Sequence, residues 1–256
     1  FTMAACNFSS VELIGIVGND FTDKGWKILK SKNIDYSNVS IKEGKTFRWG
    51  GKYSPDYSSR DTLFTDLGVF ENYVPKIKSS TNDSGILFLA NIQPSLQLNV
   101  LEFYKNKVSL IVSDTMNLWI DTDIDGLNKV IEQTDVFLLN DEEAIQLTGH
   151  KNLQSAGEAL LKQGPSTVII KQGSKGSILL ENGCSFKIPC VPDIEVFDPT
   201  GAGDSFAGGM LGYMSKYGET NKITALIHAS AIASFTVSNF GINNLINLNF
   251  KEYERR

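Results

Sequence analysis

The chain has 256 residues, 41% of them hydrophobic, so it is long enough to bury a large core as one α/β domain. Its net charge of −5 offers no global attraction to nucleic acid or to anionic membranes. Three cysteines without CxxC spacing and two histidines argue against a disulfide framework, a structural zinc site and a histidine-based metal cage. No apolar run reaches about 18 residues, so we expect no membrane-spanning helix and a location in the reducing cytoplasm.

The first segments predict a helix, a strand and a second helix. The small-residue stretch from Phe1 to Cys6 is typical of the inside of a helix and not of a signal peptide. It lacks an initiator methionine, so we expect that upstream residues are missing. Residues 11–17 form a short apolar run closed by Gly18, which predicts a buried strand, and residues 21–32 carry helical spacing.

The next segments are short and rich in aromatic and β-branched residues. They cover residues 39–41, 46–49 and 62–67, and they are separated by Gly44, the pair Gly50–Gly51 and a polar loop. This pattern predicts an antiparallel flap that interrupts the main alternation and covers a cleft.

From residue 85 onward, apolar strands alternate with helical segments. We expect strands over residues 85–90, 108–113, 136–139 and 167–171, with helices near residues 96–105, 124–133, 142–147 and 153–163. This alternation predicts a mostly parallel sheet with helices on both faces. A hairpin over residues 177–180 and 185–188 and two small-residue helices over residues 202–215 and 222–238 complete the prediction.

Polar residues follow four successive predicted strands at the point where each strand ends. Because the carboxyl ends of parallel strands meet at one edge of a sheet, these residues predict a single ligand crevice. A turn or a helix cap is the alternative for each residue, and it is the favoured interpretation for Asp114, Asn140 or Asp141 taken alone. The four groups are Asn91, Asp114 with Asn117, Asn140 to Glu143, and Lys171 to Gly176.

The stretch from Asp198 to Met210 joins a glycine-rich turn to the start of a helix and places an acid there. Gly201, Ala202 and Gly203 leave the first-turn N–H groups open to an anion. The carboxylate of Asp204 is suited to accept a proton from a hydroxyl that attacks a phosphorus atom. A tight strand-to-helix turn with an N-terminal carboxylate that favours the helix dipole is the alternative.

With these motifs the sequence resembles the ribokinase-like, or PfkB-type, carbohydrate kinase family. The stretch from Asp198 to Gly209 matches the family's C-terminal signature without a gap. Asn140 to Glu143 resembles its NxxE element, Lys171 to Gly176 its KxGxxG turn, and Gly15 to Asp20 its GxxGxD segment. The resemblance spans residues 11 to about 245.

The resemblance implies a three-layer α/β/α sandwich with a mostly parallel central sheet and a small β-sheet lid. We found no repeat or linker that would mark a second domain. Residues 1–256 are therefore expected to form a single, N-terminally incomplete domain, with the lid inserted at approximately residues 38–67.

The resemblance further implies that the γ-phosphoryl group of ATP is transferred, with Mg²⁺, to an alcohol of a small sugar or sugar-like substrate. Asp204 would be the general base, and the N–H groups from Gly201 through Ala202 and Gly203 would hold the charge that develops on the phosphoryl group. Asn140 and Glu143 would act on magnesium through water. A capping box is the alternative for these two residues, and it is compatible with that role.

Nucleotide and acceptor would be held by further residues of the matching motifs. A plain hairpin turn is an equal alternative for Lys171, and packing is favoured over stacking for the lid aromatics Phe47 and Trp49. Lys52 is a second basic candidate in the lid. The residues expected at the nucleotide are Lys171, Gly173, Gly176, Thr200, Asn239 and Gly241, and those expected at the acceptor are Arg48, Asn91 and Asp204.

Two departures from the family pattern bear on cofactor and substrate. Asn244 stands where ribokinases commonly carry a serine that helps to hold a monovalent cation, so dependence on K⁺ is left open. The family's N-terminal Gly-Gly substrate motif is absent, which leaves the acceptor open. A free pentose or hexose is favoured over a nucleoside, and a phosphosugar comes third. The family's lid edges pair between subunits, so we expect a homodimer through the lid.

Two other classes of protein remain as alternatives. A nucleotide-binding sensor without turnover would have no need of a base such as Asp204. A dinucleotide-dependent oxidoreductase should carry GxGxxG after its first strand, and the segment from Gly15 to Gly18 lacks that spacing.

Overall fold

The computed structural model describes residues 1–256 except 33, 56, 58–59, 72, 78–84 and 182, and the chain forms two compact units. The larger comprises Met3–Ser9 and Ser80–Arg256 with Phe1, and the smaller comprises Ser10–Ser79 with Thr2. A separate domain and a lid insertion within one domain both give such a division. The assignment of a single kinase domain therefore stays a prediction.

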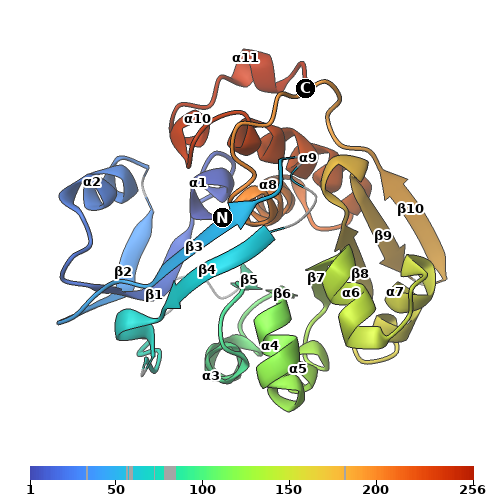
Figure 1. Cartoon of the computed structure of the whole chain (residues 1–256), viewed down its shortest axis with the longest axis horizontal. Coiled ribbons are helices and arrows are strands. Elements are labelled where there is room, and N and C mark those ends of the chain that lie inside the picture. The colour runs from blue at the N-terminus through green and yellow to red at the C-terminus, as the bar shows by residue number, and fades with distance from the viewer. Residues whose placement is uncertain (33, 56, 58–59, 72, 78–84, 182) are drawn as a thin grey trace. The chain divides into compact units, whose positions relative to one another are not determined.

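A six-stranded sheet in the order β10-β9-β8-β7-β6-β5 forms the centre of the larger unit (Figure 1). Its first four strands in the chain run parallel, and the last two add an antiparallel hairpin at one edge. This confirms the predicted mostly parallel sheet. The strands are β5 (Ile86–Leu89), β6 (Leu110–Asp114), β7 (Val136–Asn140), β8 (Thr167–Lys171), β9 (Ser177–Glu181) and β10 (Cys184–Ile188).

Helices cover both faces of this sheet, because successive side chains of a strand point to opposite faces. Leu138 and Ile169 pack with α8 and α9 in one core cluster, whereas Phe137 and Val168 pack with α5, α6 and α7 in the other. The three-layer α/β/α fold is thereby confirmed. The helices that the structure describes outside residues 10–79 are α1 (Thr2–Ala5), α3 (Pro94–Tyr104), α4 (Asn117–Thr122), α5 (Ile124–Ile131), α6 (Asp141–Thr148), α7 (Leu153–Leu161), α8 (Ala202–Tyr217), α9 (Lys222–Val237), α10 (Asn243–Ile246) and α11 (Phe250–Tyr253), with the 3-10 turn η2 (Gly173–Lys175).

In its described residues, the smaller unit holds two separate two-stranded sheets. β1 (Glu12–Gly18) pairs in parallel with β2 (Asp35–Lys42), and β3 (Arg48–Tyr53) pairs antiparallel with β4 (Arg60–Asp66). Helix α2 (Asp23–Ser31) and the 3-10 turn η1 (Gly68–Phe70) complete the unit. The placement of residues 39–41 in the antiparallel flap was wrong, because Val39 pairs in parallel with Gly15.

The glycine pair of the flap lies inside a strand and does not end it, contrary to the prediction. A Cβ atom on Gly50 would lie 2.3 Å from the ring of Phe64, and one on Gly51 would lie 2.3 Å from the ring of Trp49. Neighbouring aromatic rings thus cover the glycine backbone and let β3 continue to Tyr53.

In the described part of the chain, no helix combines the length and the apolar character needed to cross a membrane.

Candidate active site

Three polar side chains continue the α8–α9 face of the sheet where its strands end. Val112, Leu138 and Ile169 belong to the core cluster under these helices. Two residues further along each strand stand Asp114, Asn140 and Lys171, which strand alternation places on the same face. The predicted gathering of polar groups at the carboxyl edge is therefore found for these three strands.

Lys171 and Asp114 form a buried ion pair across the intervening strand β7. Lys171 Nζ lies 2.7 Å from Asp114 Oδ2, and Asp114 is 4% exposed. Burial raises the pKa of Asp114, although the ammonium of Lys171 opposes that rise. Burial would lower the pKa of Lys171, but the carboxylates of Asp114, Glu143 and Asp204 outweigh it and raise that pKa. The ion pair is a further interaction beside the turn or cap that the sequence favoured for Asp114 taken alone.

Asn140 and Glu143 form a reciprocal cap at the start of α6. Asn140 Oδ1 accepts a hydrogen bond of 2.7 Å from the Glu143 backbone N–H, and Glu143 Oε2 accepts one of 2.8 Å from the Asn140 N–H. The capping box that the sequence offered as an alternative is thus confirmed. It fixes the Glu143 carboxylate, which is 5% exposed, beside the strand ends.

The glycine-rich turn leads into the 16-residue helix α8 with Gly201 as its N-cap. Gly201 has a φ of 82°, a left-handed conformation that glycine adopts without strain. Thr200 donates its backbone N–H to Asp198 Oδ1 at 2.9 Å. Asp204 is exposed in the first turn of α8, and among the described residues its carboxylate takes part in no hydrogen bond or ion pair.

Two buried hydroxyl groups, one on α8 and one on α9, link this turn to α9 by hydrogen bonds. Thr236 Oγ1 on α9 donates to Ser205 Oγ at 2.7 Å, and Ser205 Oγ donates to the carbonyl of Gly201. Ser205 is 2% exposed and Thr236 is 3% exposed. Sequence reasoning missed both residues. Their signal is a hydroxyl at a core position of a helix, which needs a partner.

The KxGxxG turn joins β8 to β9 through glycines with positive φ. Gly173 and Gly176 have φ angles of 55° and 87°. A Cβ on Gly176 would lie 2.1 Å from the carbonyl oxygen of Ile188, so the turn requires glycine there. Gln172 closes the turn by donating its N–H to the Gly176 carbonyl at 2.8 Å.

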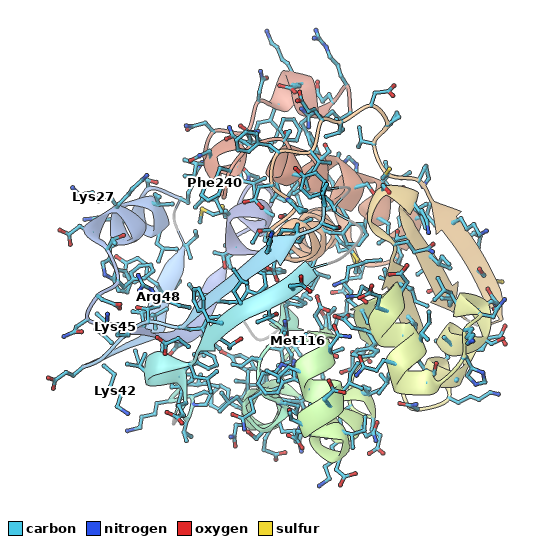
Figure 2. All side chains as sticks on the ribbon, viewed as in Figure 1. Lys27, Lys42, Lys45, Arg48, Met116 and Phe240 are labelled. Atoms are coloured by element: carbon cyan, nitrogen blue, oxygen red, sulfur yellow. The ribbon has the colours of Figure 1, made fainter. Side chains whose placement is uncertain are left out.

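The loop after α9 is organised by two asparagines. Asn239 Nδ2 donates to Asn244 Oδ1 at 2.9 Å, and Asn244 Nδ2 donates to the Phe235 carbonyl at 3.1 Å. Phe240, labelled in Figure 2, is 67% exposed in this loop, and Gly241 follows with a φ of 61°. Contact of Asn239 and Gly241 with a nucleotide stays a prediction.

Two of the three residues predicted for the acceptor, Arg48 and Asn91, lie in different units. Asn91, after β5, accepts a hydrogen bond of 2.9 Å from Trp119 Nε1 on α4. Arg48 lies on β3 of the smaller unit, with Lys45 in the turn before it (Figure 2). The binding of acceptor by either residue stays a prediction.

The GxxGxD segment anchors the turn that precedes β3. Thr46 donates its backbone N–H and its hydroxyl to Asp20 Oδ1 at 2.8 and 2.6 Å, and these bonds lower the pKa of Asp20. A Cβ on Gly18 would lie 2.2 Å from the carbonyl oxygen of Gly44. Asp20 and Gly18 of this motif therefore stabilise the turn before β3, within the smaller unit.

The donor set of the larger unit fits the phosphate groups of ATP. First-turn N–H groups of α8 and the Lys171 ammonium are both hydrogen-bond donors that favour an anion. In the described part of the chain no group of three or more His, Cys, Asp or Glu residues could hold a metal ion. Asn140 and Glu143 already bond to each other, so they suit contact with Mg²⁺ through water rather than a closed cage.

The comparisons with known proteins agree with this fold and these motifs. The profile of the pfkB family carbohydrate kinases matches residues 3–248. The chain is 30% identical over 220 residues to a cytidine kinase from Thermococcus kodakarensis, covering 84% of this chain and 77% of that protein. It is 25% identical over 229 residues to a nucleoside kinase from Methanocaldococcus jannaschii, covering 88% of this chain and 72% of that protein.

Solved structures show the same fold. The M. jannaschii nucleoside kinase, described as an archaeal member of the ribokinase family, superposes with a TM-score of 0.78 at 22% identity, covering 100% of this chain and 84% of that one. The Escherichia coli protein called ribokinase II, solved with ATP and Mg²⁺, gives a TM-score of 0.80 at 21% identity, covering 99% and 85%.

The molecule is thus a ribokinase-fold phosphotransferase with an alcohol as acceptor. The chain belongs to the pfkB family of carbohydrate kinases, and it uses ATP to phosphorylate a sugar-like substrate.

Proposed function

We propose that this kinase phosphorylates a ribose hydroxyl of a nucleoside, with Asp204 as the general base. The observation that carries the assignment of the base is the exposed, unpaired carboxylate of Asp204 in the first turn of α8. The relatives named cytidine kinase and nucleoside kinase support the nucleoside, and they shift our preference away from the free pentose or hexose favoured from the sequence.

In this reaction Asp204 takes the proton of the acceptor hydroxyl while its oxygen forms a bond to the γ-phosphorus of ATP. The bond between that phosphorus and the β–γ bridging oxygen breaks, and ADP leaves with the electron pair. Backbone N–H groups from Gly201 to Asp204 stabilise the charge on the transferred group, because the first turn of a helix leaves them without intrahelical partners. Of these groups, the Ala202 N–H also donates to the Pro199 carbonyl at 3.1 Å.

The proposed nucleotide contacts follow the loops at the carboxyl edge of the sheet. Asn140 and Glu143 hold water on Mg²⁺, which enters with ATP and neutralises phosphate charge. Arg48 and Asn91 bind the acceptor. The nucleotide lies along residues Lys171, Gly173, Gly176, Thr200, Asn239 and Gly241.

We further propose that turnover does not require K⁺. The support is the Asn244 side chain, whose oxygen and nitrogen are both engaged in hydrogen bonds within the loop after α9. Equal initial rates in NaCl and KCl at matched ionic strength are expected, and a strong stimulation by KCl would contradict this assignment.

A homodimer through the β3–β4 hairpin and a cytoplasmic location are part of the proposal. Leu63 and Phe64 on β4 are 66% and 53% exposed, so a partner that covers them would bury apolar surface. The location is supported by Cys184 and Cys190, which form no disulfide among the described residues. Sedimentation velocity of the wild type and of Leu63→Asp tests the dimer, since the charged variant should shift toward monomer.

An acceptor panel tests the nucleoside assignment. ADP release would be measured with MgATP and, in turn, cytidine, uridine, adenosine, inosine, ribose and fructose. We expect kcat/KM for at least one nucleoside to exceed that for ribose by about 100-fold or more, because the base adds buried contacts worth a few kcal/mol. A free sugar that matches or exceeds every nucleoside would overturn the assignment.

A further inference from the structure

Lys171 carries an ammonium group to the start of helix α8. A Cβ on Gly203, the second residue of α8, would lie 3.5 Å from Lys171 Nζ. Adding one carbon–carbon bond places the ammonium within about 5 Å of the Gly203 backbone. The ammonium and the first-turn N–H groups of α8 therefore border the same space.

The ammonium and the positive end of helix α8 repel each other, and the carboxylates of Asp114, Glu143 and Asp204 offset this repulsion. The N-terminus of a helix carries partial positive charge, which favours carboxylates and phosphates and repels an ammonium. Lys171 is nevertheless held there, and the raised pKa that its neighbouring carboxylates impose keeps it charged. A phosphate group between the ammonium and the helix would accept hydrogen bonds from both the Lys171 ammonium and the first-turn N–H groups of α8.

Asp114 sets the position of this ammonium. Its carboxylate lies 2.7 Å from Lys171 Nζ, and the two side chains are 5% and 17% exposed. Asp114 is held in turn, because its Oδ1 accepts a hydrogen bond of 2.9 Å from the Thr115 N–H. A fixed carboxylate thus restricts a long, flexible side chain to one location.

A second ion pair, near the other end of β8, provides a comparison. Lys222 on α9 and Glu181 on β9 also pair at 2.7 Å, with side chains 23% and 29% exposed. Glu181 lies opposite Thr167, at the start of β8, whereas Lys171 ends that strand. A buried ion pair such as Lys171–Asp114 adds little to the stability of the fold, because the cost of desolvating both charges cancels much of their attraction.

We propose that Asp114 is a positioning residue that holds the Lys171 ammonium against the first turn of α8, where the ammonium binds the γ-phosphoryl group of ATP. The proposal rests on the phosphotransfer function of this site and does not depend on which alcohol is the acceptor.

The direct test is the affinity of the protein for ATP relative to ADP, measured by calorimetry with Mg²⁺ and without acceptor. Lys171→Met should weaken ATP binding by about 10- to 100-fold, the loss expected for one charge-assisted hydrogen bond, and should change ADP binding much less. Lys222→Met is the matched control, because it breaks an ion pair of the same length and should leave both affinities unchanged.

Asp114→Asn keeps the size of the side chain and removes its charge. It should lower the ATP-to-ADP affinity ratio in the wild-type background but not in the Lys171→Met background, because Asp114 acts through Lys171. Asp114→Glu should restore part of the ratio. Loss of folding stability alone would not change this ratio, so the readout separates positioning from a structural role.

Equal loss of ATP and ADP affinity in Lys171→Met, or no loss of either, would overturn the proposal. So would an Asp114→Asn effect that persists unchanged when Lys171 is replaced. If Lys171→Met does not fold, as judged by circular dichroism, an unchanged ratio in Asp114→Asn is sufficient to overturn it. Failure to find a nucleoside acceptor would contradict the proposed function and leave this binding result intact.

Discussion

Replacement of Thr236 by valine tests whether the hydroxyl chain behind α8 holds the catalytic turn. Thr236 Oγ1 donates to Ser205 Oγ, which donates to the Gly201 carbonyl, and both hydroxyl residues are at most 3% exposed. Valine keeps the shape but leaves the Ser205 hydroxyl without its donor. We expect the free energy of unfolding to fall by about 1–3 kcal/mol, the cost of an unsatisfied buried polar group.

The effect on turnover should exceed what this loss of stability explains. Without Thr236 Oγ1, the Ser205 hydroxyl is held only by its own bond to the Gly201 carbonyl. The first-turn N–H groups can then shift relative to the phosphoryl group, and a shift of about 1 Å can cost about 100-fold in rate. We therefore expect kcat to fall by about 10-fold or more with a smaller change in KM for ATP. Urea unfolding and steady-state kinetics at a temperature well below the melting transition measure the two effects.

A second buried hydroxyl pair serves as the control. Thr134 Oγ1 and Ser113 Oγ lie 2.9 Å apart, and Thr134 is 3% exposed. Ser113 alternates with Asp114, so it faces away from the α8–α9 side of the sheet. Thr134→Val should lose similar stability and keep its kcat. An equal kcat in Thr236→Val and Thr134→Val would refute the role of the Thr236–Ser205 chain.

Two further predictions concern stability. Burial lowers the pKa of His228 below its ordinary value of 6.5, so its contribution to stability is complete above pH 6.5 and is lost as pH falls from there through the folded pKa. His228→Phe keeps a ring to stack on Tyr213, whose centroid is 4.1 Å away, and its melting temperature should fall less below pH 6.5 than that of the wild type; equal slopes would contradict this. Gly176→Ala combines a φ of 87° with a Cβ 2.1 Å from the Ile188 carbonyl oxygen, whereas Gly183→Ala has a φ of 75° and open space. Urea unfolding should show a loss above about 3 kcal/mol for the first and about 1–2 kcal/mol for the second, and equal losses would rule out the clash.

The layered fold could be predicted, because it follows from local patterns of apolar residues in the sequence. Residues 136–139 are all apolar and all fully buried, and a short apolar run between turn signals is what a strand covered on both faces requires. The Asn140–Glu143 capping box is equally local, since both partners lie within one helical turn.

Features that depend on distant partners were not predictable in the same way. Asp114 and Lys171 are 57 residues apart, and their pairing depends on the register of β6 and β8 on either side of β7. Ser205 and Thr236 are 31 residues apart and meet only because α8 packs on α9. The sequence shows that a hydroxyl or a carboxylate is present, but it does not show which distant residue the group will bond to.

The errors in the flap have the same origin. Gly50 and Gly51 read locally as a break, but the rings of Trp49 and Phe64 cover them and allow β3 to continue. Val39 was grouped with the flap by composition, and its parallel pairing with Gly15 is a long-range choice that composition does not encode.

The turnover of Asp204→Asn tests the central claim most directly. Asparagine keeps the size of the side chain at the third residue of α8 but cannot accept the proton of the acceptor hydroxyl. With the best acceptor of the panel, we predict a kcat lower by about 100- to 10,000-fold, while the Kd for MgATP changes by less than about threefold. A variant that binds ATP and retains turnover near the wild-type rate would contradict the assignment of Asp204 as the base.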